Sequence, residues 1–112
     1  MYAYWERSKR KMGGVAIHVN GEPKGEVHTG GYYPFIISPG TVSLGYSVIV
    51  HPMVGVRLKK ERMLEFWAEA GQTYYVAYRP WSGTWYPQLV LVPAEQAHPK
   101  VATYTLGRDF KP

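Results

Sequence analysis

Residues 15–27, VAIHVNGEPKGEV, are typical of two short strands around a tight turn. The first arm alternates apolar and polar side chains, and Asn20-Gly21 follows it directly. A two-residue hairpin turn needs positive φ at both central positions, which Asn and Gly adopt more readily than other residues. The stretch therefore predicts an antiparallel hairpin, from which the rest of the chain can be interpreted outward.

The two segments that follow carry the same signs of strand structure. Residues 30–40, GGYYPFIISPG, hold aromatic and branched side chains between a Gly pair and a Pro-Gly turn. Pro34 lies inside this run and has no N–H to donate, so we expect it at a sheet edge or at a bulge. Residues 41–50, TVSLGYSVIV, alternate apolar and polar residues, which predicts a strand with one buried face.

Other segments complete the predicted order of elements. Strands are expected over residues 2–7, 73–78 and 88–92, one helical turn over 94–97 before Pro99, and a short strand within 101–106. Four glycines are interpreted as turn residues, because each falls where the chain is expected to reverse: Gly21, Gly25, Gly40 and Gly71.

Residues 57–71, RLKKERMLEFWAEAG, fit two structures. A helix would bring together Met63, Phe66, Trp67 and Ala70, with Gly71 as its C-terminal cap. A strand would turn one set inward, Leu64, Phe66 and Ala68, and another outward, Glu65, Trp67 and Glu69. The pattern alone leaves the choice between helix and strand open for residues 59–70.

Composition supports an all-β domain. The chain has 112 residues, of which 46% are hydrophobic and 15% aromatic, together with 12 Gly and 9 Pro. Aromatic residues favour pleated, half-buried surfaces, and many turn residues imply short strands. We therefore expect one domain over residues 1–112, a small antiparallel β-sandwich with about seven or eight short strands and at most one short helical turn.

Several classes of site are disfavoured by the residues present. The chain has no Cys, which excludes disulfides, thiolate zinc sites and Cys nucleophiles. Its four His residues form no HxH or HExxH motif, so we expect no metal site. Ser47 lacks the G-x-S-x-G elbow of hydrolases, and Glu65 and Glu69 are interpreted as surface charges. We expect neither a cofactor nor enzymatic activity.

The beginning of the chain lacks the order of a signal peptide. In MYAYWERSKRKMGG the basic cluster comes after the aromatic residues rather than before an apolar run. The chain also has no apolar run long enough to span a bilayer. An exported form would therefore require that a leader or lipid anchor has been removed, and without one the expected location is cytoplasmic.

The order of motifs resembles the DUF2846 family of small bacterial envelope proteins, many of them predicted lipoproteins. The similarity covers residues 2–100 and combines an NG hairpin, a Tyr-to-Pro-Gly segment and an AGxTYYV block. The matching positions are Asn20, Gly21, Gly25, Tyr33, Pro39, Gly40, Ala70, Gly71, Thr73, Tyr74 and Tyr75. The resemblance implies a prealbumin-like β-sandwich, favours a strand in the ambiguous segment, and carries no catalytic residues. The lipobox Cys of the lipoproteins is absent, and the tail GRDFKP has no counterpart.

The best candidate for a binding site is the loop YRPWSGTWYP, residues 78–87. Arg79, Trp81, Trp85 and Tyr86 surround Ser82-Gly83, and rigid aromatic side chains with an Arg are the usual constituents of binding hot spots. The opposing interpretation is that both Trp rings fold back to close the end of the sandwich. On the first interpretation these four residues contact a protein partner.

A nucleic-acid-binding, OB-like barrel is the alternative function. The formal net charge is 13 − 8 = +5, with basic clusters at residues 7–11 and 57–62. Basic grooves with stacking aromatics bind single strands, but here the basic clusters are remote in sequence from the Trp-rich loop. The leading hypothesis is therefore a non-catalytic protein-interaction module of the bacterial envelope, which contacts a protein partner through the aromatic loop and an exposed sheet edge near Pro34.

Overall fold

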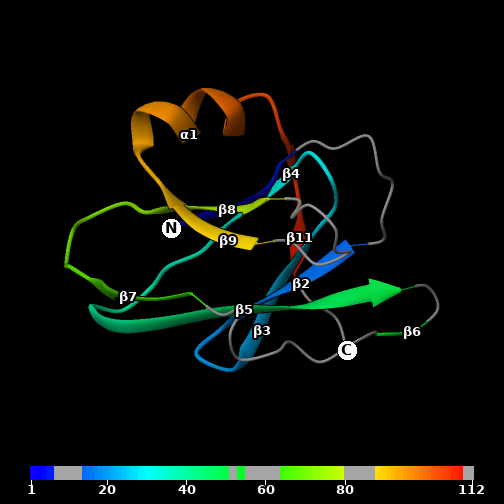
Figure 1. Ribbon diagram of the computed structural model, residues 1–112, viewed down its shortest axis with the longest axis horizontal. Coiled ribbons are helices and arrows are strands. Elements are labelled where there is room, and N and C mark those ends of the chain that lie inside the picture. Colours follow the sequence, from blue (N-terminus) through cyan, green and yellow to red (C-terminus); the bar gives the residue numbers. More distant parts are fainter. Residues whose placement is uncertain (7–13, 51–52, 55–63, 80–87, 110–112) are drawn as a thin grey trace.

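The fold was analysed in a computed structural model, which describes residues 1–6, 14–50, 53–54, 64–79 and 88–109. Two β-sheets face each other, and one helix covers the outer side of the first sheet (Figure 1). Sheet A contains, in spatial order, β10 (Thr105–Leu106), β4 (Gly31–Pro34), β1 (Tyr2–Trp5), β8 (Tyr75–Arg79) and β9 (Gln88–Val92).

Sheet B is built around the predicted hairpin. Its order is β11 (Arg108–Asp109), β3 (Glu22–Val27), β2 (Gly14–Val19), β5 (Gly40–Val50) and β6 (Met53–Val54), and β7 (Leu64–Ala68) also pairs with β5. Helix α1 (Ala94–Val101) follows β9 directly. The all-β sandwich is thus confirmed, although the described residues form eleven strands rather than seven or eight. The additional ones, β6, β10 and β11, have two residues each.

Not all of the pairing is antiparallel. β1 runs parallel to β8, with Tyr2 beside Tyr75 and Trp5 beside Tyr78, and β10 runs parallel to β4. A parallel neighbour must come from a distant part of the chain, because parallel strands cannot be joined by a tight turn. The local pattern predicts a strand at residues 2–7, of which residues 2–5 form β1, but it says nothing about this partner.

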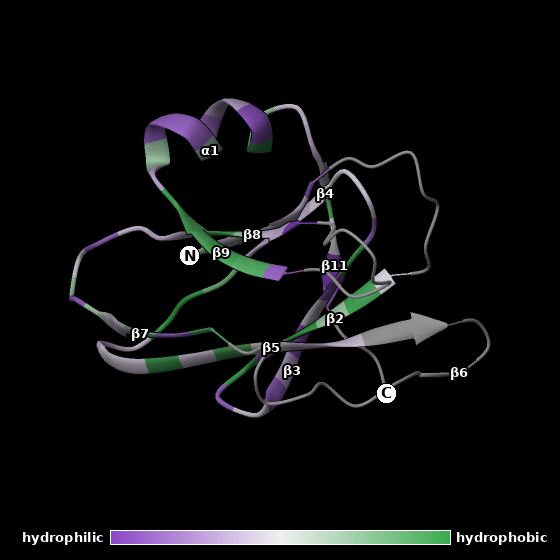
Figure 2. Cartoon of the chain, viewed as in Figure 1, coloured by the Kyte–Doolittle hydropathy of each residue, from purple (hydrophilic) through white to green (hydrophobic). Residues whose placement is uncertain are grey.

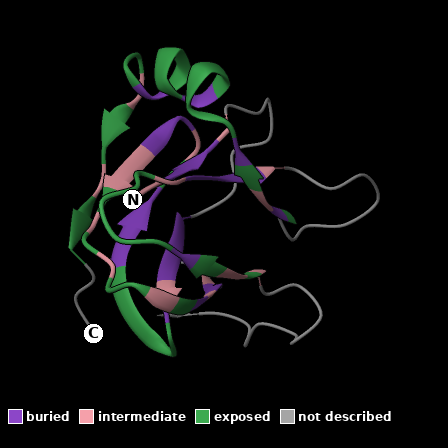
Figure 3. Cartoon of the chain, turned by 90° about the vertical axis from the view of Figure 1, so that its left-hand side faces the viewer, coloured by how far each residue is buried: buried purple, intermediate pink, exposed green. Residues whose placement is uncertain are grey.

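The hydrophobic core has two parts, one on each side of sheet A. Figure 2 shows alternating apolar and polar residues along β5, and Figure 3 shows that α1 is exposed except on the side facing the sheet. The main cluster lies between the sheets and includes Trp5, Ile17, Leu44, Tyr46, Val76 and Tyr78. The second cluster lies between sheet A and α1: Tyr4, Tyr75, Ala77, Val92, Ala97 and Val101.

The hairpin forms as predicted, with one correction. Asn20 and Gly21 have φ values of 50° and 85°, as a primed turn requires. Gly25, however, is not a turn residue, because it is buried within β3. A Cβ at this position would lie 2.7 Å from ring carbons of Tyr33, so glycine is needed there for close packing.

The ambiguous segment is a strand where it is described. In β7, Ala68 is buried and Leu64 and Phe66 are half-buried, whereas Glu65 and Trp67 are exposed. This is the alternation predicted for a strand, and the β5 backbone opposite it explains the outcome, since Gly40 to Leu44 pair with the whole of β7.

The end of the chain differs from the prediction. α1 continues through Pro99 to Val101, so it has two turns rather than one, and the strand expected within 101–106 is limited to β10. Ala97 and Val101 lie one turn apart and both are buried against sheet A. Burial of Val101 therefore extends the helix past the proline, even though Pro99 removes a helical hydrogen bond.

Candidate interaction surface

Of the four residues predicted for the aromatic loop, the structure describes Arg79. Arg79 is the last residue of β8, whereas Trp81, Trp85 and Tyr86 lie outside the described residues. The side chain of Arg79 makes an ion pair within the molecule. Its Nε donates a hydrogen bond of 3.0 Å to Oε2 of Glu6, and Lys100 Nζ from α1 lies 3.2 Å from the same oxygen.

This ion-pair cluster was not predicted from the sequence. Glu6 lies 73 residues from Arg79 and 94 residues from Lys100, so no local pattern connects them. The cluster ties the end of β1 to the end of β8 and to the last turn of α1. Glu6 is the least exposed of the three, with 18% of its side chain accessible, and its carboxylate is therefore compensated by both cations.

The sheet edge near Pro34 has a defined hydrogen-bonding pattern. Phe35 N donates to Met1 O, and Met1 N donates to Phe35 O, each at 2.8 Å. Alternate residues of an antiparallel pair direct their backbone groups to opposite sides. The backbone groups of Pro34 and Ile36 therefore face away from β1, and Pro34 occupies a position whose N–H would otherwise point outward.

This arrangement confirms that Pro34 lies at an edge. β10 pairs with β4 only at Gly31 and Tyr32, so among the strands described none covers the outer side of Pro34. Edge strands are commonly protected from pairing by proline. Beyond Pro34, no strand in the described ranges pairs with Ile36 on this side.

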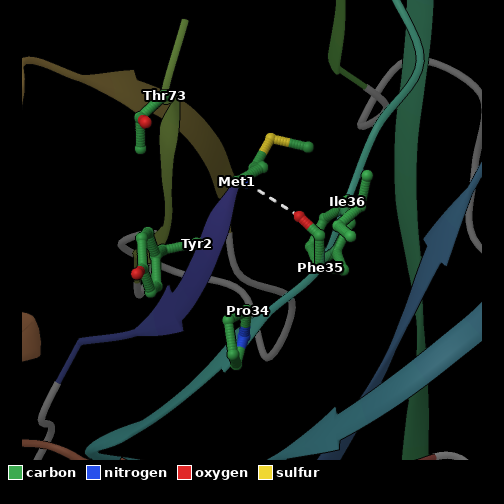
Figure 4. A pocket seen from close by; sticks show the side chains of 6 residues that line it. All are labelled: Met1, Tyr2, Pro34, Phe35, Ile36 and Thr73. Carbon is green, nitrogen blue, oxygen red and sulfur yellow. Dashed lines mark hydrogen bonds between the residues drawn. The ribbon is translucent and has the colours of Figure 1, made fainter. Parts of the chain in front are cut away.

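An open hollow of about 330 Å³ lies beside this edge, lined by Met1, Tyr2, Pro34, Phe35, Ile36 and Thr73. Figure 4 shows Met1 between Thr73 and Tyr2 on one side and Phe35 and Ile36 on the other. Ile36 is 99% exposed, the highest value among the large hydrophobic residues that the structure describes as exposed. Phe35 by contrast is half-buried against the main core, so the two neighbours face in different directions.

Arg79 and the Pro34 edge lie at opposite ends of sheet A. β1 and β8 are parallel, so Met1 and Thr73 precede one end of these strands and Glu6 and Arg79 come at the other. Among the described residues, the ion pair of Arg79 with Glu6 is therefore separate from the edge near Pro34.

A layer of tyrosines between sheet A and α1 was also missed. The Tyr2 and Tyr75 rings stack with their centroids 5.1 Å apart, and Tyr4 and Tyr104 meet edge to face at 5.9 Å. The alternation of tyrosines at positions 2 and 4 was a signal for this layer, since both point to the same face. Burial raises the pKa of Tyr4 to about 12, and its hydroxyl has no hydrogen-bond partner within the described structure.

Ser47 and His18 form the one pair of described residues that resembles part of a catalytic site. Ser47 Oγ and His18 Nε2 lie 2.9 Å apart on neighbouring strands of sheet B. Burial lowers the pKa of His18 and favours its neutral form. A hydrolytic triad also needs a carboxylate on Nδ1 and donors for an oxyanion, and the described contacts of His18 supply no such carboxylate. The pair is a hydrogen bond between strands.

Among the described residues, no three His, Asp or Glu side chains gather as a metal ion would require. Nor does any helix there combine the length and apolar character needed to cross a membrane.

Comparison with known proteins gives no match: no family model fits the chain, and no curated protein or solved structure matches it.

Proposed function

We propose that this chain is a non-catalytic protein-interaction module whose contact surface is the sheet edge at Pro34 and Ile36 with the adjoining hollow. The observation that carries the proposal is the complete exposure of Ile36 beside an open edge. Single apolar residues on a surface are common. Here, however, an exposed apolar side chain, backbone groups that no described strand pairs with, and a concave surface occur together.

Both the exposed side chain and the outward-facing backbone groups of Ile36 would be stabilised by contact with a partner. Covering a side chain of the size of Ile contributes about 1.5–3 kcal/mol. The N–H and C=O of Ile36 face away from β1, so an extended partner segment can pair with them by β-augmentation. Pro34 restricts this pairing, because it offers only its carbonyl group. Pro34 therefore restricts the register in which a partner strand can pair with this edge.

The cellular setting in this proposal comes from the resemblance to the DUF2846 family, which favours a bacterial envelope or periplasmic protein. In this setting the module serves as a subunit of a larger assembly. The loop residues Trp81, Trp85 and Tyr86 form the second contact surface in the proposal. Arg79 contributes to that surface by holding the end of β8, since its Nε is bound to Glu6.

Burial of the tyrosines favours this function over the nucleic-acid-binding alternative. Stacking of bases requires exposed rings, whereas Tyr4, Tyr46, Tyr75 and Tyr78 are all buried. Their rings contribute to the two cores, and among the described residues Trp67 is the one aromatic side chain that is classed as exposed.

The test is site-specific photo-crosslinking in cells that express the chain. We expect benzoylphenylalanine at Ile36 to capture a defined protein, and the same group at exposed Gln96 on α1 to capture none. Ile36→Asp should abolish the interaction with that protein while leaving the unfolding transition unchanged, because the Ile36 side chain is almost fully exposed in the folded chain. Equal crosslinking at both positions, or an unchanged interaction in Ile36→Asp, would refute the proposed surface.

A further inference from the structure

Residues 105–109 connect the edges of both sheets. β10 lies on β4 and β11 lies on β3, so one short segment continues from sheet A into sheet B. Thr105 N donates to Gly30 O at 3.0 Å, and Gly107 N donates to Tyr32 O at 2.7 Å. The segment therefore satisfies backbone groups of β4 that would otherwise form an exposed edge.

Gly107 is the point at which the segment crosses between the sheets. A Cβ at this position would collide with the carbonyl oxygen of Glu26 and lie 3.2 Å from that of Tyr32. Both are backbone atoms of paired strands, which cannot move aside without disturbing their ladders. The groove between β3 and β4 therefore accepts only a chain with glycine at its centre.

Little apolar surface attaches the segment to the molecule. Thr105, Leu106, Arg108 and Asp109 are all exposed, and Leu106 retains 60% of its accessible surface. Attachment depends instead on backbone hydrogen bonds and on two side-chain contacts. Segments with few buried apolar contacts open at lower free energy than the core.

The two side-chain contacts give the groove a chemical preference. Arg108 Nε donates to Glu26 Oε2 at 3.0 Å, and 10% of the Glu26 side chain is accessible, so its carboxylate needs a cation in place. The Tyr33 hydroxyl donates to Asp109 Oδ1. An occupant must therefore bring a basic residue followed by a carboxylate directly after its glycine.

We propose that residues 105–109 are a displaceable strand, and that the groove beneath them binds an extended segment of a protein partner with this chemistry. The occupant supplies two N–H groups two residues apart for the carbonyls of Gly30 and Tyr32, then a basic and an acidic side chain for Glu26 and Tyr33. The inference rests on the proposed interaction function. Displacement of residues 105–109 would uncover β4 at Gly31 and Tyr32 and so lengthen the edge that is available to a partner near Ile36.

A labelled peptide tests the groove directly. The probe is TYTLGRD, the sequence of residues 103–109, and the matched control is TYTLVRD, with valine at the glycine position. Full-length chain carrying Arg108→Ala and Asp109→Ala has a weakened strand of its own. Fluorescence anisotropy should show that it binds the glycine peptide at least about tenfold more tightly than the parent chain does, and about tenfold more tightly than it binds the valine peptide.

Two results would overturn the inference: equal binding of the glycine and valine peptides, or no binding by the double variant with its near-ultraviolet circular dichroism unchanged. If the double variant does not fold, amide hydrogen exchange of the parent chain tests whether residues 105–109 open separately from the core. The amides of Thr105 and Gly107 should exchange at least about a hundredfold faster than those of β2, whereas equal rates would exclude separate opening. Peptide binding without crosslinking at Ile36 would retain the groove under residues 105–109 and reject the proposed contact at Ile36.

Discussion

The burial of His18 and its hydrogen bond to Ser47 contribute separately to the stability of the fold. It lies on β2, half-buried, with Ser47 Oγ 2.9 Å from its Nε2. The lowered pKa of the ring has burial as its cause. Because the folded protein disfavours protonated His18 relative to the unfolded chain, this residue stabilises the fold above the ordinary His pKa of about 6.5, and the contribution is lost as the pH falls through the lower folded-state value.

We therefore predict that His18→Gln reduces the pH dependence of stability. The free energy of unfolding of the parent chain should fall between pH 7.5 and pH 5 by more than that of the variant, as measured by urea denaturation at each pH. Ser47→Ala is the control. It removes the hydroxyl but leaves the ring half-buried, so it should keep the parent pH dependence. A parent-like dependence in His18→Gln would show that His18 does not contribute.

Helix α1 is an element maintained by a few tertiary contacts. Pro93 precedes it without a side-chain cap, and Pro99 lies within it. Only Ala97 and Val101 of the helix are buried, and Lys100 adds its contact with Glu6. Isolated helices of this length are unstable in water, so the tyrosine layer of sheet A supplies most of the stabilisation of α1.

The two prolines should respond differently to substitution. Pro99→Ala restores an N–H that can donate to the carbonyl group of Glu95, and we expect it to raise the free energy of unfolding by about 1 kcal/mol after the entropy gained by the unfolded chain. Pro93→Ala should change little, because a group at the beginning of a helix has no helical acceptor. Both are measured by chemical denaturation. Destabilisation by Pro99→Ala would mean that the proline ring itself packs against the sheet.

Across the whole molecule, polar contacts join the two sheets through an apolar interior. Tyr78 of sheet A donates its hydroxyl to Gly45 O of sheet B at 3.1 Å, and its ring meets Tyr46 edge to face with centroids 5.7 Å apart. Tyr78 is fully buried, and this burial raises the pKa of its hydroxyl. The hydrogen bond to Gly45 O gives the buried hydroxyl of Tyr78 an acceptor in the core, as buried polar groups require.

Tyr78→Phe should therefore lower the free energy of unfolding by about 1–2 kcal/mol, the usual result of removing one partner of a buried hydrogen bond. Tyr74→Phe is the matched control. Its hydroxyl accepts the N–H of Glu69 at 2.9 Å in an exposed position, so water can replace it and the loss should be below about 0.5 kcal/mol. Urea denaturation compares the two variants. Equal losses in the free energy of unfolding would show that the buried hydrogen bond between the sheets contributes no more to stability than the exposed one.

Sequence reasoning identified features whose causes are local. Alternation predicted β5, Asn20-Gly21 predicted the hairpin, and Pro34 predicted an edge or a bulge, whereas alternation left helix or strand open for the segment that contains β7. Each depends on side-chain direction or on backbone conformation within a few residues. The all-β sandwich followed because such strands bury their apolar faces only against another sheet.

Tertiary structure decided everything that depends on distant neighbours. The parallel pairing of β1 with β8, the packing of Tyr33 on Gly25, the crossing at Gly107 and the sharing of the Glu6 carboxylate all join residues far apart in the chain. Local patterns determine which way a side chain points, but not what it meets. The sequence by itself therefore determined most of the longer strands and the fold class. The exposure of Ile36 beyond Pro34, the crossing of residues 105–109 between the sheets and the ion pair of Arg79 with Glu6 were decided by which strands came together.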